Sequence, residues 1–288
     1  MKKSRIVVLI IVSTLVMTYA LSFANAWPGD GDCREEHGIT PVDIAYDRSA
    51  NLKLDGVPSE SFWEKEENQE GKIEIPLATE PNTSYFYVVY LNATFIRNDK
   101  YMYILCQWKD NTTKPNIGNL YDGLYFCWNI DCPNFSANFE TGMDTASMGG
   151  GDVDNWDWDI NQATSPNGTS MEMGDFCFGE KGWYSRNLEN QDVTIAYTHK
   201  KDEFYTVEIQ RKLMTNEEYD VQFDEKKEYF FNMGVMNDGR HADHAVSWTY
   251  AMKFKTPSIN GYYPDLLLIF GLITIISIFL FERNKVKR

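Results

Sequence analysis

The chain has 288 residues, 15% of them aromatic, and a formal net charge of −15. This acidic balance argues against nucleic acid as a partner, because the phosphate backbone demands a basic face. The many Tyr, Val, Phe and Trp residues, set among turn residues, are the composition of a β protein.

The first 26 residues predict a secretory signal peptide. A basic start, Met1 to Arg5, precedes an apolar run that ends at Phe23, and Ala24-Asn25-Ala26 supplies the small-x-small cleavage site. We therefore expect the mature chain to begin at Trp27. An uncleaved membrane anchor is the alternative, since the apolar run is long.

Residues 27–50 predict a loop-rich lead-in, and residues 51–258 predict one β domain. After a turn at Asp55-Gly56 and a short helical piece at Phe62-Trp63, apolar and polar residues alternate in about nine segments. The expected strands are Lys72–Leu77, Tyr85–Phe95, Lys100–Trp108, Gly123–Ile130, Asp154–Asn161, Val193–His199, Glu203–Leu213, Tyr229–Met236 and Ala245–Lys255. Gly123–Ile130 is apolar on both faces and is expected at the centre of a sheet. Without repeats or a Pro/Ser-rich linker, this pattern predicts an all-β, antiparallel β-sandwich.

The C-terminal end predicts a membrane anchor. The apolar segment 264–281 is long enough for a transmembrane helix, and the tail 282–288 holds four basic residues against one acidic residue. By the positive-inside tendency this tail is cytoplasmic, which places the β domain outside the cell membrane. A buried core helix is the alternative, but such a helix would not end in a basic tail.

All five cysteines, Cys33, Cys106, Cys127, Cys132 and Cys177, fall in the predicted ectodomain, where disulfides are the default. Cys127 and Cys132 are close enough in sequence to pair, while Cys106 or Cys177 could equally take either. The odd count leaves one thiol free or intermolecular. Zinc is disfavoured because the chain has no C-x-x-C. Five segments that fit the glycan acceptor pattern predict a glycosylated exterior; they begin at Asn82, Asn92, Asn111, Asn134 and Asn167.

Catalytic motifs are absent from the sequence. It contains no G-x-S-x-G, no H-E-x-x-H and no phosphate-binding glycine loop. The chain is therefore expected to be a binding protein or an electron carrier and not an enzyme.

Trp156-Asp157-Trp158 is an unusual feature within an expected strand. Side chains alternate across a strand, so Trp156 and Trp158 share one face. Two indoles on one face either fill a core or form a flat platform for a sugar or a porphyrin.

A second candidate site lies on the loop Asn237–Trp248, which holds His241 and His244 at the expected rim of the sheet. Imidazole is a common ligand of metals and of haem iron. Met143 and Met148, in the turn-rich segment before the Trp156 strand, offer soft thioethers that suit haem iron or copper. Packing and surface roles are the alternatives for all four residues.

Three segments together resemble a known family: Asp55-Gly56 followed by Phe62-Trp63, Asp154 to Trp158, and the turn and strand of Asn237–Trp248. They resemble the haem-binding domain of ethylbenzene dehydrogenase-type γ subunits, which is related in fold to family 9 carbohydrate-binding modules and to DOMON domains. The resemblance covers about residues 50–255.

The resemblance implies a haem b whose iron is held by a Met and a basic residue. The corresponding positions here are Met148, with Met143 as second choice, and His244 in place of the usual Lys, while Trp156 and Trp158 would line the pocket. The haem would be non-covalent, because the sequence has no C-x-x-C-H. The His-for-Lys replacement and the C-terminal anchor depart from the family. A module of this family that has lost its haem is therefore an open alternative.

The main hypothesis is therefore a membrane-anchored electron-transfer domain that works with a redox partner protein. The alternative is a surface-displayed carbohydrate-binding module in which the same tryptophans bind a glycan. A third hypothesis is a structural or adhesive envelope protein without a small ligand.

Overall fold

The computed structural model describes residues 39–78, 88–110, 121–135, 149–160, 171–172, 174–179, 184–185, 192–200, 203–239 and 245–255. The predicted signal peptide, the transmembrane segment 264–281 and the basic tail lie outside these residues. Among the residues described, no helix is long and apolar enough to span a membrane.

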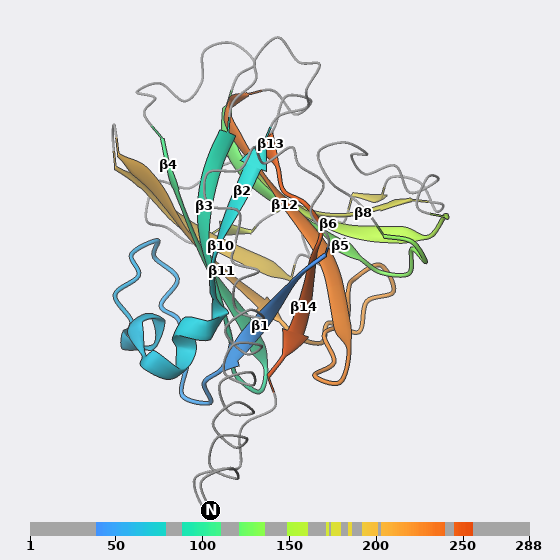
Figure 1. Cartoon of the computed structure of the whole chain (residues 1–288), viewed down its shortest axis with the longest axis horizontal. Helices are drawn as coiled ribbons and strands as arrows, with labels where there is room; N and C mark the ends of the chain where they lie inside the picture. Colours follow the sequence, from blue (N-terminus) through green and yellow to red (C-terminus); the bar gives the residue numbers. More distant parts are fainter. Residues whose placement is uncertain are drawn as a thin grey trace, which may run out of the picture.

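The described residues form one 14-stranded sheet that folds over on itself (Figure 1). One layer has the strand order β7-β10-β11-β4-β3, and the other has the order β14-β12-β5-β6-β8-β9. The bounds of the first layer are β7 (Met171–Glu172), β10 (Val193–Lys200), β11 (Phe204–Lys212), β4 (Tyr101–Lys109) and β3 (Val88–Arg97). Those of the second are β14 (Tyr250–Phe254), β12 (Glu228–Gly239), β5 (Tyr121–Asn129), β6 (Asp152–Asp159), β8 (Gly174–Gly179) and β9 (Tyr184–Ser185).

Three further strands join the two layers along one edge. β1 (Thr40–Tyr46) lies between β3 and β14, and β2 (Lys72–Ala78) pairs with β3 and with β13 (Ala245–Val246), which in turn pairs with β12. Two 3-10 helices, η1 (Ser61–Glu64) and η2 (Glu66–Gly71), precede β2. The β-sandwich prediction is thus confirmed as a sheet closed along this edge.

Strand β1 corrects the prediction in two ways. Residues 40–46 were expected in a loop-rich lead-in, yet Val42 and Ile44 are buried at alternate positions and form a strand. β1 also pairs in parallel with both β14 and β3, so the sheet is not purely antiparallel. The alternation in this seven-residue segment is short, and only the neighbouring strands give it backbone partners.

The expected strand Ala245–Lys255 is also divided. Ser247 separates β13 from β14, because its hydroxyl accepts the backbone N–H of Met233 at 2.9 Å and donates to the carbonyl of Trp248 at 2.7 Å. These bonds satisfy backbone groups that a regular ladder would otherwise pair. The other expected strands agree with β2, β3, β4, β5, β6, β10, β11 and β12 to within a few residues, and β5 is central as predicted.

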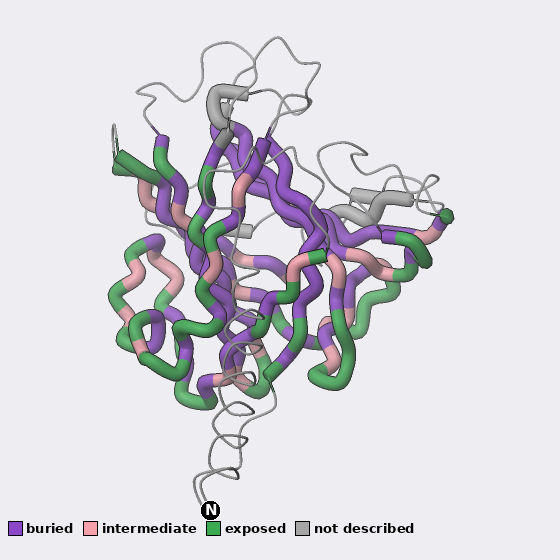
Figure 2. Tube along the Cα trace, viewed as in Figure 1, coloured by how far each residue is buried: buried purple, intermediate pink, exposed green. Residues whose placement is uncertain are grey.

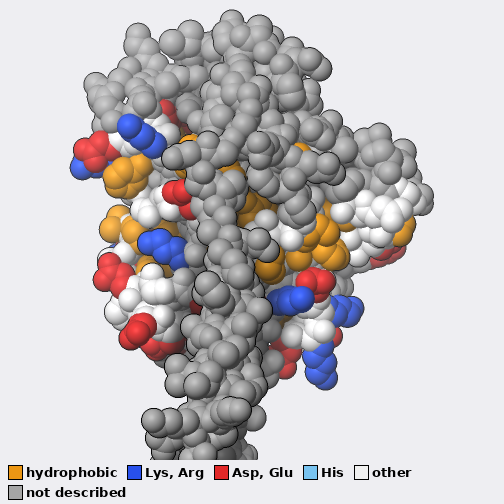
Figure 3. Space-filling model, viewed as in Figure 1, with side chains coloured by type: hydrophobic (Ala, Val, Ile, Leu, Met, Phe, Trp, Pro, Cys, Tyr) orange, Lys and Arg blue, Asp and Glu red, His pale blue; other side chains and the backbone are white. Residues whose placement is uncertain are grey.

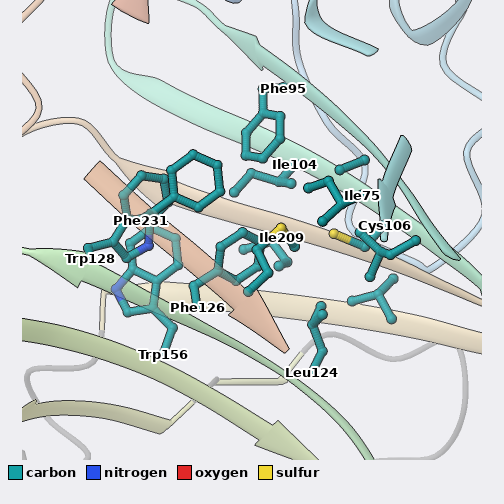
Figure 4. Packing of buried hydrophobic residues seen from close by; sticks show 14 of the residues in the cluster. Ile75, Phe95, Ile104, Cys106, Leu124, Phe126, Trp128, Trp156, Ile209 and Phe231 are labelled. Atoms are coloured by element: carbon teal, nitrogen blue, oxygen red, sulfur yellow. The ribbon is translucent and has the colours of Figure 1, made fainter. Parts of the chain in front are cut away.

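The core lies between the two layers, where the inward side of nearly every strand is buried (Figure 2). Aromatic rings from β5, β6 and β12 meet at its centre (Figure 4). Trp128 stacks on Phe231 with ring centroids 4.6 Å apart and lies 5.1 Å from Trp156. These rings supply large apolar areas, so burial of this cluster is a main source of stability.

The pairing of Cys127 with Cys132, one of those that the sequence left open, is not formed in the structure. Both belong to a cluster on the outer side of β5 and β12, but no disulfide joins them. Cys106 is a thiol in the main core. Burial raises the pKa values of the Cys106 and Cys127 thiols, which keeps both in the unreactive neutral form. Cys33 and the side chain of Cys177 lie outside the described structure.

Candidate functional site

The outer face of β3, β4 and β11 carries a row of polar side chains. Strand register places Asn92 opposite Gln107, and Gln107 opposite Thr206. The Gln107 amide donates to the Thr206 hydroxyl at 3.2 Å. Adjacent strands are about 4.8 Å apart, so the row spans about 10 Å, from exposed Asn92 through half-buried Gln107 to buried Thr206.

A second row on the same face carries exposed rings. Lys109 lies opposite Phe204, whose side chain is 39% exposed, and Tyr90, two residues before Asn92 on β3, is 49% exposed. Residues two apart on a strand point to the same face about 7 Å from one another, so the ring-bearing row adjoins the polar row. The exposed rings of Phe204 and Tyr90 therefore lie beside the amides of Asn92 and Gln107.

A cavity of about 500 Å³ opens where these rows meet, lined by Asn92, Gln107, Trp108, Lys109, Glu203 and Phe204. The backbone N–H of Asp110 donates to the carbonyl of Glu203 at 3.1 Å, which holds the ends of β4 and β11 together at its rim. The volume is in the range of small-ligand sites. We take this cavity and its rim as the candidate site.

Three aromatic rings stack on the inward side of β4, β11 and β10, beneath the cavity. Tyr205 lies between Trp108, at 4.9 Å, and His199, at 4.1 Å, with both pairs nearly parallel. The Tyr205 hydroxyl donates to buried Asp122 at 2.8 Å, and burial raises the pKa of Tyr205 above its ordinary range. Trp108 belongs both to this stack and to the residues that line the cavity, so the stack packs against the inward side of the strand beneath the site.

The turn Asp55-Gly56 docks at the β10 end of the polar row. The Thr198 hydroxyl, opposite Thr206, donates to the carbonyl of Gly56 at 2.7 Å. On the same face of β11, buried Glu208 accepts the backbone N–H groups of Gly56 at 2.8 Å and Asp55 at 3.2 Å. Burial raises the pKa of Glu208 to about 7, although these two hydrogen bonds act in the opposite direction. The D-G segment of the sequence therefore has a structural role beside the site.

Trp156 and Trp158 are placed in the core, with exposures of 0% and 1%. The Arg211 guanidinium lies over the Trp156 ring at 5.1 Å, and Trp158 contacts the Tyr197 ring at 4.8 Å. Of the two roles that the sequence allowed, the structure therefore shows core packing, and neither indole offers an open face to a sugar or a porphyrin.

The proposed iron ligands Met143, Met148 and His244, together with His241, lie outside the described residues. The described residues that follow Met148 and His244 in the chain lie at opposite ends of β6. Gly149 lies near Pro133, before β6 begins. Ala245 on β13 aligns, through the register of β12 and β5, with Trp158 near the end of β6. Within the described part of the chain, no group of His, Cys, Asp or Glu could hold a metal ion. The haem site therefore stays a prediction, because its proposed ligands fall outside the part of the chain that the structure describes.

His199 and the outer face of the sheet were missed by the sequence reasoning. Of the four histidines, His199 is the one that the structure describes, and it continues the inward positions Val193, Ile195 and Tyr197 of β10. The alternation of apolar residues along this strand therefore predicts that His199 points inward. Asn92, Gln107 and Phe204 carry no such signal, because their proximity depends on strand pairing between distant segments.

Two predicted glycan acceptors, Asn92 and Asn134, fall on described residues, and both have exposed side chains. The structure thus leaves each accessible to modification. Asn92 lies in the candidate site, where an attached glycan would occupy the cavity.

Comparisons with known proteins give matches among solved structures alone: no family model and no curated protein matches the chain. A family 9 carbohydrate-binding module from Caldicellulosiruptor kristjanssonii, solved with cellotriose, is 10% identical with a TM-score of 0.44, over 78% of this chain and 98% of that one. A second structure of a family 9 module from the same organism, solved with glucose, is 10% identical with a TM-score of 0.43, over 77% of this chain and 100% of that one. A candidate carbohydrate-binding protein from Bacteroides uniformis is 10% identical with a TM-score of 0.48, over 75% and 99%.

The haem-binding-domain resemblance is not confirmed by these matches. Identities of 10% and TM-scores below 0.5 leave the function of this chain to be argued from its own residues.

Proposed function

We propose that the chain is a non-catalytic carbohydrate-binding protein whose ligand occupies the cavity on β3, β4 and β11. The observation that carries the proposal is the exposed Phe204 ring beside the Asn92 and Gln107 amides in a cavity of about 500 Å³. This is the carbohydrate-binding alternative from the sequence, moved from the buried tryptophans to a surface that a ligand can reach.

Sugar chemistry fits these groups. A pyranose ring carries hydroxyls around its edge and C–H groups on its faces. Amides provide both donors and acceptors for hydroxyls, and the electron-rich face of an aromatic ring attracts the polarised C–H groups. Asn92 and Gln107 would bind the ring edge while Phe204 packs against its face. Tyr90 extends the apolar flank for a neighbouring sugar unit.

The electron-transfer hypothesis receives no support from the described residues. Both iron ligands that it requires lie outside them, and the two tryptophans expected to line a haem pocket pack in the core. We retain the predicted location outside the cell membrane as part of the proposal, since a signal peptide and an anchor at 264–281 would display the site on the cell surface.

The test is a binding screen of the purified full-length protein against a panel of polysaccharides and oligosaccharides, followed by titration calorimetry. Phe204→Ala and Asn92→Ala are each expected to weaken binding by about ten-fold, as for residues central to an interface. Met214→Ala is the matched control, because Met214 is also apolar and 49% exposed but lies away from the cavity. Its affinity should equal that of the native protein.

Mass spectrometry of Asn92 accompanies this test. An unmodified Asn92 keeps the cavity open to a separate ligand, and Asn92→Gln, which retains an amide, should keep more affinity than Asn92→Ala. Absence of binding to every glycan, or equal binding by all variants, contradicts the proposal and favours a structural or adhesive role.

A further inference from the structure

Lys109 is the unbalanced charge of the candidate site. It lies directly opposite Phe204 in the register of β4 and β11 and lines the cavity. The other charged lining residue, Glu203, is held by Lys200 with 2.6 Å between the ammonium nitrogen and the carboxylate oxygen. Within the described structure no carboxylate pairs with Lys109, so this lining residue brings a positive charge to the cavity without a counter-charge.

This positive charge is local. The chain carries a net charge of −15, and on the face shown in Figure 3 the described acidic and basic side chains are interspersed. At physiological ionic strength a charge is screened beyond about 8 Å. A ligand seated against Phe204 would therefore sense Lys109 more strongly than the distant acidic residues, while the carboxylate of neighbouring Glu203 is paired with Lys200.

The ligand class follows from the contacts that a bound ligand would make with the ammonium group of Lys109. A neutral sugar would displace water from Lys109 and return hydroxyl contacts alone. A sugar with a carboxylate would form a charge-assisted hydrogen bond, which is roughly twice as strong as a neutral one. Asn92, exposed on the polar row two strands from Phe204, offers an amide N–H to the second carboxylate oxygen.

Resting on the carbohydrate-binding function proposed above, we propose that the ligand is an acidic glycan whose uronate carboxylate is bound by Lys109 while its ring packs on Phe204. Lys109 is then the residue that sets specificity, and the aromatic and amide groups supply contacts that neutral and acidic sugars share.

The test compares ligands that differ in charge alone. Tetragalacturonate and glucuronoxylan fragments are each paired with their carboxyl-reduced counterparts, which keep the linkage and the ring hydroxyls. Affinities for the full-length protein are measured by calorimetry at low and at high sodium chloride. We expect about ten-fold tighter binding of at least one acidic member at low salt, a preference that shrinks as salt screens the ion pair.

Lys109→Gln is the decisive variant, since it keeps a long polar side chain and removes the charge. It should abolish the preference, so that the acidic member and its reduced counterpart bind the variant with equal affinity. Lys253→Gln is the control, because Lys253 lies on β14 and pairs with Glu228 at 2.8 Å, outside the cavity. It should bind both ligands like the native protein.

The outcomes separate this inference from the function on which it rests. If the native protein binds reduced and acidic members equally, or Lys109→Gln keeps the preference, the acidic-glycan proposal is wrong while carbohydrate binding stands. If no member of any pair binds, and the wider panel is also negative, both proposals fail.

Discussion

Glu208 accepts the backbone N–H of Gly56 at 2.8 Å, and this bond joins residues 152 positions apart in the chain. It fixes the Asp55-Gly56 turn against the outer face of β11, next to Thr206 and the polar row of the candidate site. A buried carboxylate that holds a turn in this way makes the docking of the turn sensitive to pH and to backbone shape.

The first prediction concerns the protonation of Glu208. Burial raises its pKa from 4.5 to about 7, and the nearby Glu60 and Asp55 carboxylates also raise it. Because the folded pKa exceeds the unfolded value, this group contributes stability fully below pH 4.5 and loses that contribution as pH rises through about 7. Urea unfolding at pH 5 and pH 8 should show a smaller loss of unfolding free energy in Glu208→Gln than in the native protein.

Glu217→Gln is the control for this prediction, since Glu217 is exposed. It should show the native pH dependence. The assignment to Glu208 would be refuted by an identical pH dependence in Glu208→Gln.

The second prediction concerns Gly56. Its φ is +74°, and a Cβ atom there would lie 2.4 Å from the carbonyl carbon of Tyr197. Gly56→Ala should therefore lower the free energy of unfolding by about 2–4 kcal/mol, through backbone strain and through forced separation from β10. Val57→Ala, at an exposed neighbouring position, should change it by less than about 0.5 kcal/mol. A stability near native for Gly56→Ala would show that the turn does not pack against β10.

The third prediction uses the pair Gly234 and Tyr125, which face each other on β12 and β5. A Cβ atom on Gly234 would overlap the Tyr125 ring, with ring carbons as near as 1.9 Å. Gly234→Ala should destabilise the protein by about 1–3 kcal/mol, because the ring must leave its position. Thermal unfolding of a double-mutant cycle checks this: with Tyr125→Ala already present, the cost of Gly234→Ala should largely disappear. Additive effects would show that the two residues do not interact.

The fourth prediction concerns Asp47, which accepts hydrogen bonds from Lys65, from Asn68, and from the backbone and hydroxyl of Ser49. Burial opposes ionisation, but these bonds prevail and lower the pKa of Asp47 to about 2. Its stabilising effect is therefore present above about pH 3.8 and is lost as pH falls through 2. Asp47→Asn should cost about 1–3 kcal/mol at pH 6, and less at pH 3, in chemical unfolding. An equal cost at both pH values would contradict the charged role of Asp47.

Much of the fold could be predicted because alternation of apolar residues is local. The pattern placed β5 at the centre of a sheet and put Trp156 and Trp158 on one face of their strand. Alternation could not say whether that face points into the core or to solvent, because both faces of a strand look alike until a second layer covers one of them. The burial of both indoles decided this in favour of core packing, one of the two roles that the sequence had left open.

The sequence by itself determined the β composition and most of the strands. The tertiary structure alone decided the candidate site, since Asn92, Gln107 and Phe204 belong to three strands whose register brings them to one cavity. The physical reason is that strand pairing is a long-range contact. Backbone hydrogen bonds between distant segments determine which side chains become neighbours. The alternation within a single strand does not show which strands will pair or in which register.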